Sequence, residues 1–285
     1  MVIAAALLLL ADPRLPAGGH AHSGCVEPAV AAGLVRDDES LRAFLAGRLA
    51  TSGLVSAAFA AAACLECGRP APRWALLDRE LDARTPSPAQ RAASRAQGRG
   101  LLRAAAAAWP SPRWDELRTG VNGPFTPFYW CDGPFTPTTP GRPATPGAPA
   151  TSGAPATAGG PATAGGPATP VDPHHAVVLG ACTWVAGGTP HDAATLAAMA
   201  AVTGPASAAV RLLGLDPLAV HAVLAGLAEQ VDAVSAAAAA ADATGPAAAA
   251  GADATGPAGL PSSSAPAMEV LAELHRHQEV GLFES

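Results

Sequence analysis

Residues 37–64 read DDESLRAFLAGRLATSGLVSAAFAAAAC, and this stretch decides the fold class. Its leucine, valine and phenylalanine residues recur near a period of 3.6, which is typical of a helix that buries one face. Asp37, Asp38 and Ser40 supply N-cap candidates and acidic side chains for the first turn. Gly53 offers a point at which the stretch divides into two helices. The pattern predicts helical structure over residues 38–64.

Helix signals of the same kind recur further along the chain. Ser87-Pro88 and Asp216-Pro217 place a capping residue before a proline at the first helical position, and Thr189-Pro190 adds Asp192 at the third. No segment shows the sustained alternation of a strand. The sequence therefore predicts an all-α fold, a single helical domain of roughly eight or more helices.

Two low-complexity segments interrupt these helical patterns. Between Gly141 and Pro170 run five hexads, GRPATP, GAPATS, GAPATA, GGPATA and GGPATP, and none of them holds a core-forming residue. Such sequence buries too little apolar area to offset its ordering entropy, so we expect disorder. The predicted organisation is 1–118 for the first half of the domain, 119–172 for a disordered insertion, 173–235 for the second half, 236–266 for a linker and 267–285 for a C-terminal helix and tail.

The composition of the chain indicates which class of partner and which cellular compartment to expect. The net charge of −6 disfavours nucleic-acid binding, and five cysteines, an odd number, fit a reducing cytoplasm better than a disulfide framework. The apolar run at residues 2–11 has no basic residue before it and is too short to span a bilayer. We therefore expect a cytoplasmic protein whose first helix is buried.

The glycine-rich stretch at 15–27, LPAGGHAHSGCVE, is the first candidate site. Its glycines suit a backbone that needs positive φ or the close approach of another chain. His20, His22 and Cys25 are metal-capable and suit a late transition metal such as nickel or zinc. No base-and-orienter pattern surrounds Ser23, so we predict no catalytic residue. A metal loop and a shaped loop that a partner protein grips remain the alternatives.

Other candidates lie outside this loop. Arginines at 91, 95, 99 and 103 fall on one helical stripe, which is either a solvated face or a docking stripe for an acidic partner or a phosphate. The pair Cys64 and Cys67 has no second pair at zinc-site spacing, so we interpret both as small buried or half-buried thiols. His174 and His175 flank the insertion and are expected to be solvated.

Four blocks of sequence resemble the UreF family of urease accessory proteins. The first is Leu15-Pro16-Ala17-Gly18-Gly19-His20-Ala21-His22-Ser23-Gly24 with Glu27, and the second is the segment from Arg91 to Arg99. The third is Ala208-Ala209-Val210-Arg211-Leu212-Leu213-Gly214-Leu215. The fourth is the terminus, residues 277–285, in which Gly281 and Glu284 depart from arginines common in the family.

This resemblance implies a non-enzymatic, all-helical and dimeric helper. Proteins of this family join the accessory protein UreD (also called UreH) and the GTPase UreG on urease apoprotein, where GTP hydrolysis drives nickel insertion. Nickel and GTP are then handled by the complex, and the chain needs no cofactor of its own. The alternative is a nickel carrier that uses His20, His22 and Cys25. The residues expected to contact partners are Gly18, Gly19, His20, Ser23, Glu27, Arg95, Arg99, Arg211 and Phe283.

Overall fold

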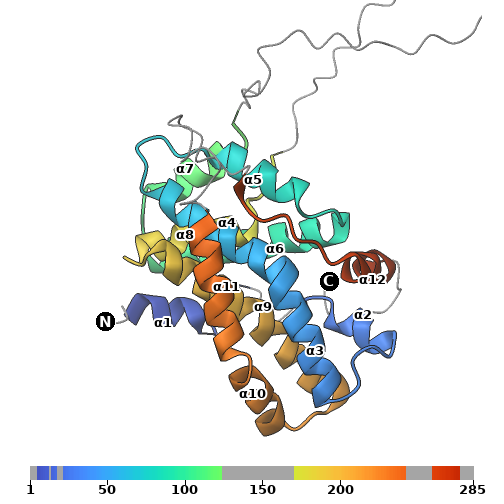
Figure 1. Ribbon diagram of the computed structural model, residues 1–285. Helices are drawn as coiled ribbons and strands as arrows, with labels where there is room; N and C mark the ends of the chain where they lie inside the picture. The colour runs from blue at the N-terminus through green and yellow to red at the C-terminus, as the bar shows by residue number, and fades with distance from the viewer. Residues whose placement is uncertain (1–4, 13, 18–21, 124–169, 242–258, 277–285) are drawn as a thin grey trace, which may run out of the picture. The chain divides into compact units, whose positions relative to one another are not determined.

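The computed structural model describes residues 5–12, 14–17, 22–123, 170–241 and 259–276. Every regular element within these ranges is a helix, and no β-strand occurs in them, which confirms the all-α prediction (Figure 1). In chain order the helices are α1 (Ala5–Ala11), α2 (Val26–Ala31), α3 (Asp38–Arg48), α4 (Leu54–Cys67), α5 (Trp74–Ala83), α6 (Pro88–Ala108), α7 (Arg113–Gly120), α8 (His175–Val185), α9 (Pro190–Leu213), α10 (Pro217–Ala225), α11 (Ala228–Ala241) and α12 (Pro266–Arg276).

Helix α4 forms the centre of the core because it is apolar on every side. Every residue from Ala57 to Cys64 is buried, and α8, α9 and α11 pack against this helix. Figure 1 shows α4 among these helices, although α8 and α9 follow it in the sequence only after the long insertion. The two halves of the sequence therefore build one shared core.

Glycine permits the closest of these helix contacts. A Cβ atom at Gly180 of α8 would overlap the carbonyl oxygen of Ala60 and would lie 2.7 Å from the Cβ of Ala63 on α4. Because only a residue without a side chain fits there, the backbones of α4 and α8 approach each other directly.

The predicted division at Gly53 does not break the helical path. A π-helical turn spans Leu49–Gly53 and joins α3 to α4. Gly53 itself is buried, with Ala201 of α9 close enough that an added Cβ would lie 3.3 Å from the Cβ of that alanine. The glycine is thus explained by helix packing and not by the end of a helix.

The helix starts follow the predicted capping residues. The Asp37 side chain accepts a hydrogen bond from the backbone N–H of Ser40, and the Ser40 side chain completes a capping box at α3. Ser87, Thr189 and Asp216 cap α6, α9 and α10 through their side chains, each before a proline in the first turn. These caps satisfy N–H groups that the helices leave without an internal partner.

Two helical stretches, Asp38–Cys67 and Pro190–Leu213, are long and apolar enough to cross a membrane by length and composition. The bent pair α10 and α11 would make a third if counted as one span. Within the protein, 67% of the most apolar window of the first stretch and 44% of the second are buried against other elements. An alanine-rich core helix is expected to show high hydropathy for this reason, so these stretches establish no membrane location.

Some boundaries differ from those expected from composition. Helix α7 continues to Gly120, past residue 118, and α11 continues to Ala241, past residue 235. Alanine is the best helix former, so the alanine run at 236–241 extends the helix instead of opening a linker. The hexads and the residues 242–258 lie outside the described residues.

Both ends of the described chain beside the insertion meet at Asn122. Its side-chain amide donates to the carbonyl oxygen of Val171 (3.1 Å), and its side-chain oxygen accepts from the backbone N–H of Val171 (2.8 Å). The chain therefore leaves and re-enters the described helical body at neighbouring points, which the Asn122–Val171 contact holds together.

We predict that deleting residues 141–170 leaves the protein folded. Because Asn122 already fixes the exit and the return of the chain, helix content by circular dichroism and the Tm should change little, by less than about 1 kcal/mol of unfolding free energy. A loss of helix content or a collapse of the thermal transition would show that the hexads contribute to the fold.

Candidate functional site

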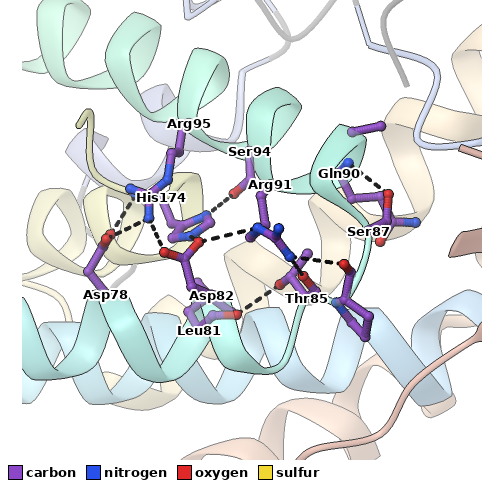
Figure 2. A network of polar contacts seen from close by, with 12 residues as sticks. Asp78, Leu81, Asp82, Thr85, Ser87, Gln90, Arg91, Ser94, Arg95 and His174 are labelled. Atoms are coloured by element: carbon purple, nitrogen blue, oxygen red, sulfur yellow. Dashed lines mark hydrogen bonds and ion pairs between the residues drawn. The ribbon is translucent and has the colours of Figure 1, made fainter. Parts of the chain in front are cut away.

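A cluster of charged side chains at Arg95 is the most developed polar site among the described residues (Figure 2). The Nη2 atom of Arg95 on α6 lies 2.9 Å from Asp78 Oδ2 and 2.7 Å from Asp82 Oδ2, and both carboxylates belong to α5. The Arg95 Nη1 atom donates to the carbonyl oxygen of Asp172. Only 2% of the Asp78 side chain and 16% of the Arg95 side chain are exposed, so this is a buried ion pair. It joins α5 and α6 to the chain that returns from the insertion.

His174 completes the cluster and corrects the prediction of a solvated histidine. Its side chain is fully buried, with Nε2 2.9 Å from Asp82 Oδ1 and Nδ1 2.9 Å from the hydroxyl of Ser94. Since a carboxylate only accepts, Nε2 carries a proton that it donates to Asp82. Figure 2 shows the ring between α6 and the carboxylates. Sequence placed this histidine beside a disordered segment, but the fold places it beside α5 and α6.

Gly98 is the position that lets the returning chain reach this cluster. A Cβ atom there would overlap the carbonyl oxygen of Pro173 and would lie 3.0 Å from the carbonyl carbon of His174. The backbone at 173–175 therefore crosses α6 in direct contact with the helix. The Gly98 in the second block of the UreF resemblance thus has a packing role.

The cluster keeps Asp82 ionised. Burial raises the pKa of Asp82, but the hydrogen bond and charge of His174 and the charge of Arg95 outweigh burial, and the net pKa is lowered. A carboxyl whose folded-state pKa is depressed stabilises the fold above its unfolded-state pKa, and this stabilisation is lost as pH falls through the folded-state pKa. The cluster therefore favours the folded state at neutral pH.

The same cluster is the one place in the described chain where three metal-capable side chains converge. One ligand atom from each of Asp78, Asp82 and His174 lies within 4.8 Å of the others. However, Arg95 already contacts both carboxylates, and its positive charge would repel a divalent cation at that position. The donor set does not fit a bound metal, and we interpret it as a structural ion-pair cluster.

Three of the four arginines in the stripe are engaged by groups of the same chain. Besides Arg95, Arg99 pairs with Asp172 at 2.6 Å, although its side chain is 59% exposed, and Arg91 donates to the carbonyl oxygens of Thr85 and Pro86. Arg103 is exposed and forms no ion pair or hydrogen bond through its side chain with another described residue. Acidic and carbonyl groups from α5 and residue 172 separate the like charges, which relieves the repulsion expected from the sequence.

The described part of the glycine-rich loop faces inward. Ser23 is fully buried and Cys25 is 2% exposed, and the Cys25 sulfur accepts a hydrogen bond from the Gln90 side chain at 3.4 Å. His22 is also buried. Glu27 at the start of α2 pairs with His275 of α12 at 3.3 Å. These side chains stabilise the packing of the loop, so the surface they could offer a partner is small.

Some of the remaining residues predicted to contact partners are exposed in the structure, and the others lie outside the described residues. Arg211 lies exposed in the last turn of α9, and the Arg99 side chain is 59% exposed. Gly18, Gly19, His20 and Phe283 lie outside the described residues, as do Gly281 and Glu284.

Sequence reasoning missed the acidic half of the Arg95 cluster. The signal was present, because Asp78 and Asp82 are four residues apart on one predicted helix, like Arg91, Arg95 and Arg99 on the next. Matching i, i+4 stripes of opposite charge on consecutive helices indicate a paired interface. His174 carried no comparable signal, since its partners come from two distant segments.

Helix α10 is an apolar element of the described chain with a prominently exposed side chain. Its sequence PLAVHAVLA contains no charged residue, yet only Val220 is buried, and Leu218 is 80% exposed. Exposed contiguous apolar surface marks interaction sites more often than it marks ordinary surface. The fold places this chain in the class of all-helical proteins.

Comparison with known proteins gives the family. The sequence model of the UreF family matches residues 35–228. Proteins named "Urease accessory protein UreF" are similar over nearly the whole chain: 39% identity with that of Mycobacterium sp. (strain JLS), over 98% of this chain and 97% of the relative, and 38% and 36% with those of Mycobacterium marinum and Mycobacterium bovis, each over 100% of both chains. This chain belongs to the UreF family of urease accessory proteins.

Proposed function

We propose that this protein is a cytoplasmic, homodimeric scaffold in urease maturation. On this proposal it joins UreD (UreH) and the GTPase UreG on urease apoprotein, and the complex couples GTP hydrolysis to nickel insertion. The complex delivers nickel and hydrolyses GTP. This chain contributes binding surfaces to the complex and no catalytic residue. Family membership supports the accessory role.

The observation that carries the scaffold proposal is the exposed leucine of the uncharged helix α10. Leu218 is 80% exposed, while Val223 and Leu224 of the same helix are half-buried against the core. A protein that acts alone gains stability by burying such a side chain, whereas a scaffold can use it against a partner or a second copy. This exposed apolar side chain therefore favours assembly as the function.

The described thiols support a scaffold over a nickel carrier. Burial raises the pKa of Cys64 and of Cys67 to about 12, and the thiolate is the form that binds metal. Cys25 is buried against Gln90, so using it as a nickel ligand would require the loop to open. Each uptake and release of nickel would then require the packing of this loop to be broken.

The direct test is reconstitution of urease from apoprotein, nickel, GTP, UreD and UreG, with and without this chain. We expect activation to depend on the chain and a stable complex to form on size-exclusion chromatography. Tight nickel binding by the isolated chain in calorimetry, together with activation that does not need UreG, would favour the carrier alternative instead.

Arg211 is the predicted partner residue that is best placed for an interface, because it is charged and exposed at the end of α9. We predict that Arg211→Ala weakens pull-down of the GTPase or of the UreD-type partner by about tenfold, or about 1.4 kcal/mol. Arg103→Ala, at another exposed arginine, is the matched control and should leave binding unchanged. Equal binding by both variants and the parent protein would remove Arg211 from the interface.

A further inference from the structure

A cavity of about 170 Å³ lies where the glycine-rich loop meets the helical core. Its walls come from Gly24 and Cys25 of the loop, from α3 to α6, from the start of α8, from α9 and from the segment that leads into α12. The charged residues that line the cavity are Arg48, Arg84 and Glu269. Arg84 pairs with Glu80, and no member of the Asp78, Asp82 and His174 trio lines the cavity, although the cavity borders the Arg95 cluster at Ser94.

Arg48 is a cation without a countercharge among the described residues. Its Nε atom donates to the carbonyl oxygen of Ala201 at 3.0 Å, and no described carboxylate lies within 4.0 Å of its guanidinium. Burial lowers the pKa of Arg48, and the proximity of Cys25 opposes this shift. Arginine nevertheless stays protonated in proteins, so the cavity holds a positive charge that no described carboxylate pairs with. A partly buried charge of this kind is costly until an opposite charge meets it.

The loop packs closely against this guanidinium. Gly24 has φ of +58°, and a Cβ there would lie 3.3 Å from both Cζ and Nη2 of Arg48 and 2.8 Å from Cγ of Pro205. A side chain at this position would press on the arginine, so the close approach of the loop to the guanidinium requires glycine.

Neutral hydrogen-bonding groups surround the same space. The hydroxyl of Ser56, the amide of Gln97 and the imidazole of His175 line the cavity, and none of these three side-chain groups has a hydrogen bond to another described residue. Burial lowers the pKa of His175 to about 4, so its ring is neutral at pH 7 and offers one donor. Glu269 also lines the cavity, but no ion pair joins it to Arg48.

We propose that this cavity binds a small oxyanion, with Arg48 as its charge partner and Ser56, Gln97 and His175 as donors. The guanidinium fork matches the oxygens of phosphate, carboxylate or bicarbonate, and the neutral donors can complete their coordination. A metal cation is repelled by Arg48, and a neutral ligand would leave the charge unmet. The carboxylate of Glu269 limits the affinity, because it places a negative charge in the same cavity.

The test is thermal unfolding of the full chain in inorganic phosphate, in bicarbonate and in chloride at equal ionic strength, with calorimetry to measure Kd. We expect a saturable Tm increase of about 3 to 5 °C at tenfold excess over Kd for phosphate or bicarbonate, and none for chloride. The anion that gives the larger shift identifies which oxyanion the cavity prefers. Equal shifts with all three salts, or no saturable heat with phosphate and bicarbonate, would overturn the proposal.

Three variants test whether the anion-dependent increase in Tm arises from binding in this cavity. Arg48→Gln should abolish the anion-dependent shift, while Arg42→Gln on the exposed side of the same helix should retain it in full. Glu269→Gln should tighten binding severalfold, which no general loss of folding would produce. If Arg48→Gln does not fold, the Glu269→Gln result decides, and unchanged or weaker binding in Glu269→Gln would contradict the site.

Discussion

Arg95→Met is expected to destabilise the protein by about 3–5 kcal/mol and to lower its Tm by about 10 °C. Methionine approximates the volume of the arginine stem but leaves the carboxylate of Asp78, which is 2% exposed, without its ion-pair partner. The loss of the bond to the Asp172 carbonyl also releases the chain that returns from the insertion. Chemical denaturation followed by circular dichroism measures the free energy of unfolding directly.

Arg103→Met is the matched control, because Arg103 lies two turns further along the same helix and is exposed. It should change the unfolding free energy by less than about 0.5 kcal/mol. The pKa of Asp82 is lowered in part by the charge of Arg95, so the destabilisation of Arg95→Met should shrink at acid pH, where protonation of Asp82 removes its charge in both proteins. A pH-independent and small effect would show that the cluster contributes little to stability.

Gly180→Ala is expected to cost about 3 kcal/mol, corresponding to a Tm decrease of about 8 °C. The added methyl group would overlap the backbone carbonyl of Ala60, which cannot rotate away as a side chain can. Helices α4 and α8 would have to separate, and α4 is the most buried helix of the core. Thermal and urea unfolding of the purified variant measure the change.

The same substitution at Gly47 gives the opposite expectation. Gly47 lies within α3, and a Cβ atom there meets nothing within 4 Å. Because alanine is the better helix former, Gly47→Ala should stabilise the protein by about 0.5–1 kcal/mol. If both variants shift stability in the same direction, helix propensity outweighs the α4–α8 contact and our account of Gly180 is wrong.

The sequence predicted much of the local structure because local structure depends on neighbours in the chain. Side-chain caps at Ser87, Thr189 and Asp216, and the capping box at Asp37, are short-range interactions that the sequence displays directly. Apolar periodicity located the buried face of the helices on the same basis. The UreF resemblance rested on such local blocks, and the comparisons confirmed the family.

The candidate site was less predictable because its members are distant in sequence. His174 and Arg95 were expected to be solvent-exposed or partner-facing, yet both are buried against carboxylates of α5. Arg48 gave no signal in the sequence, since an arginine in an amphipathic helix normally lies on its polar face. Its place beside a cavity follows only from how α3, α9 and the glycine-rich loop meet.

The sequence by itself determined the helical class, the helix starts, the interrupted layout and the family, because each depends on composition or on contacts a few residues apart. Only the tertiary structure decided which charges are paired, which glycines are required and which face of α10 remains open. These depend on long-range packing, in which Gly180 and Gly98 let backbones touch and Asp78 meets Arg95 from another helix. The spacing of charges along one segment shows which side chains share a face, but only folding decides which other segment that face meets.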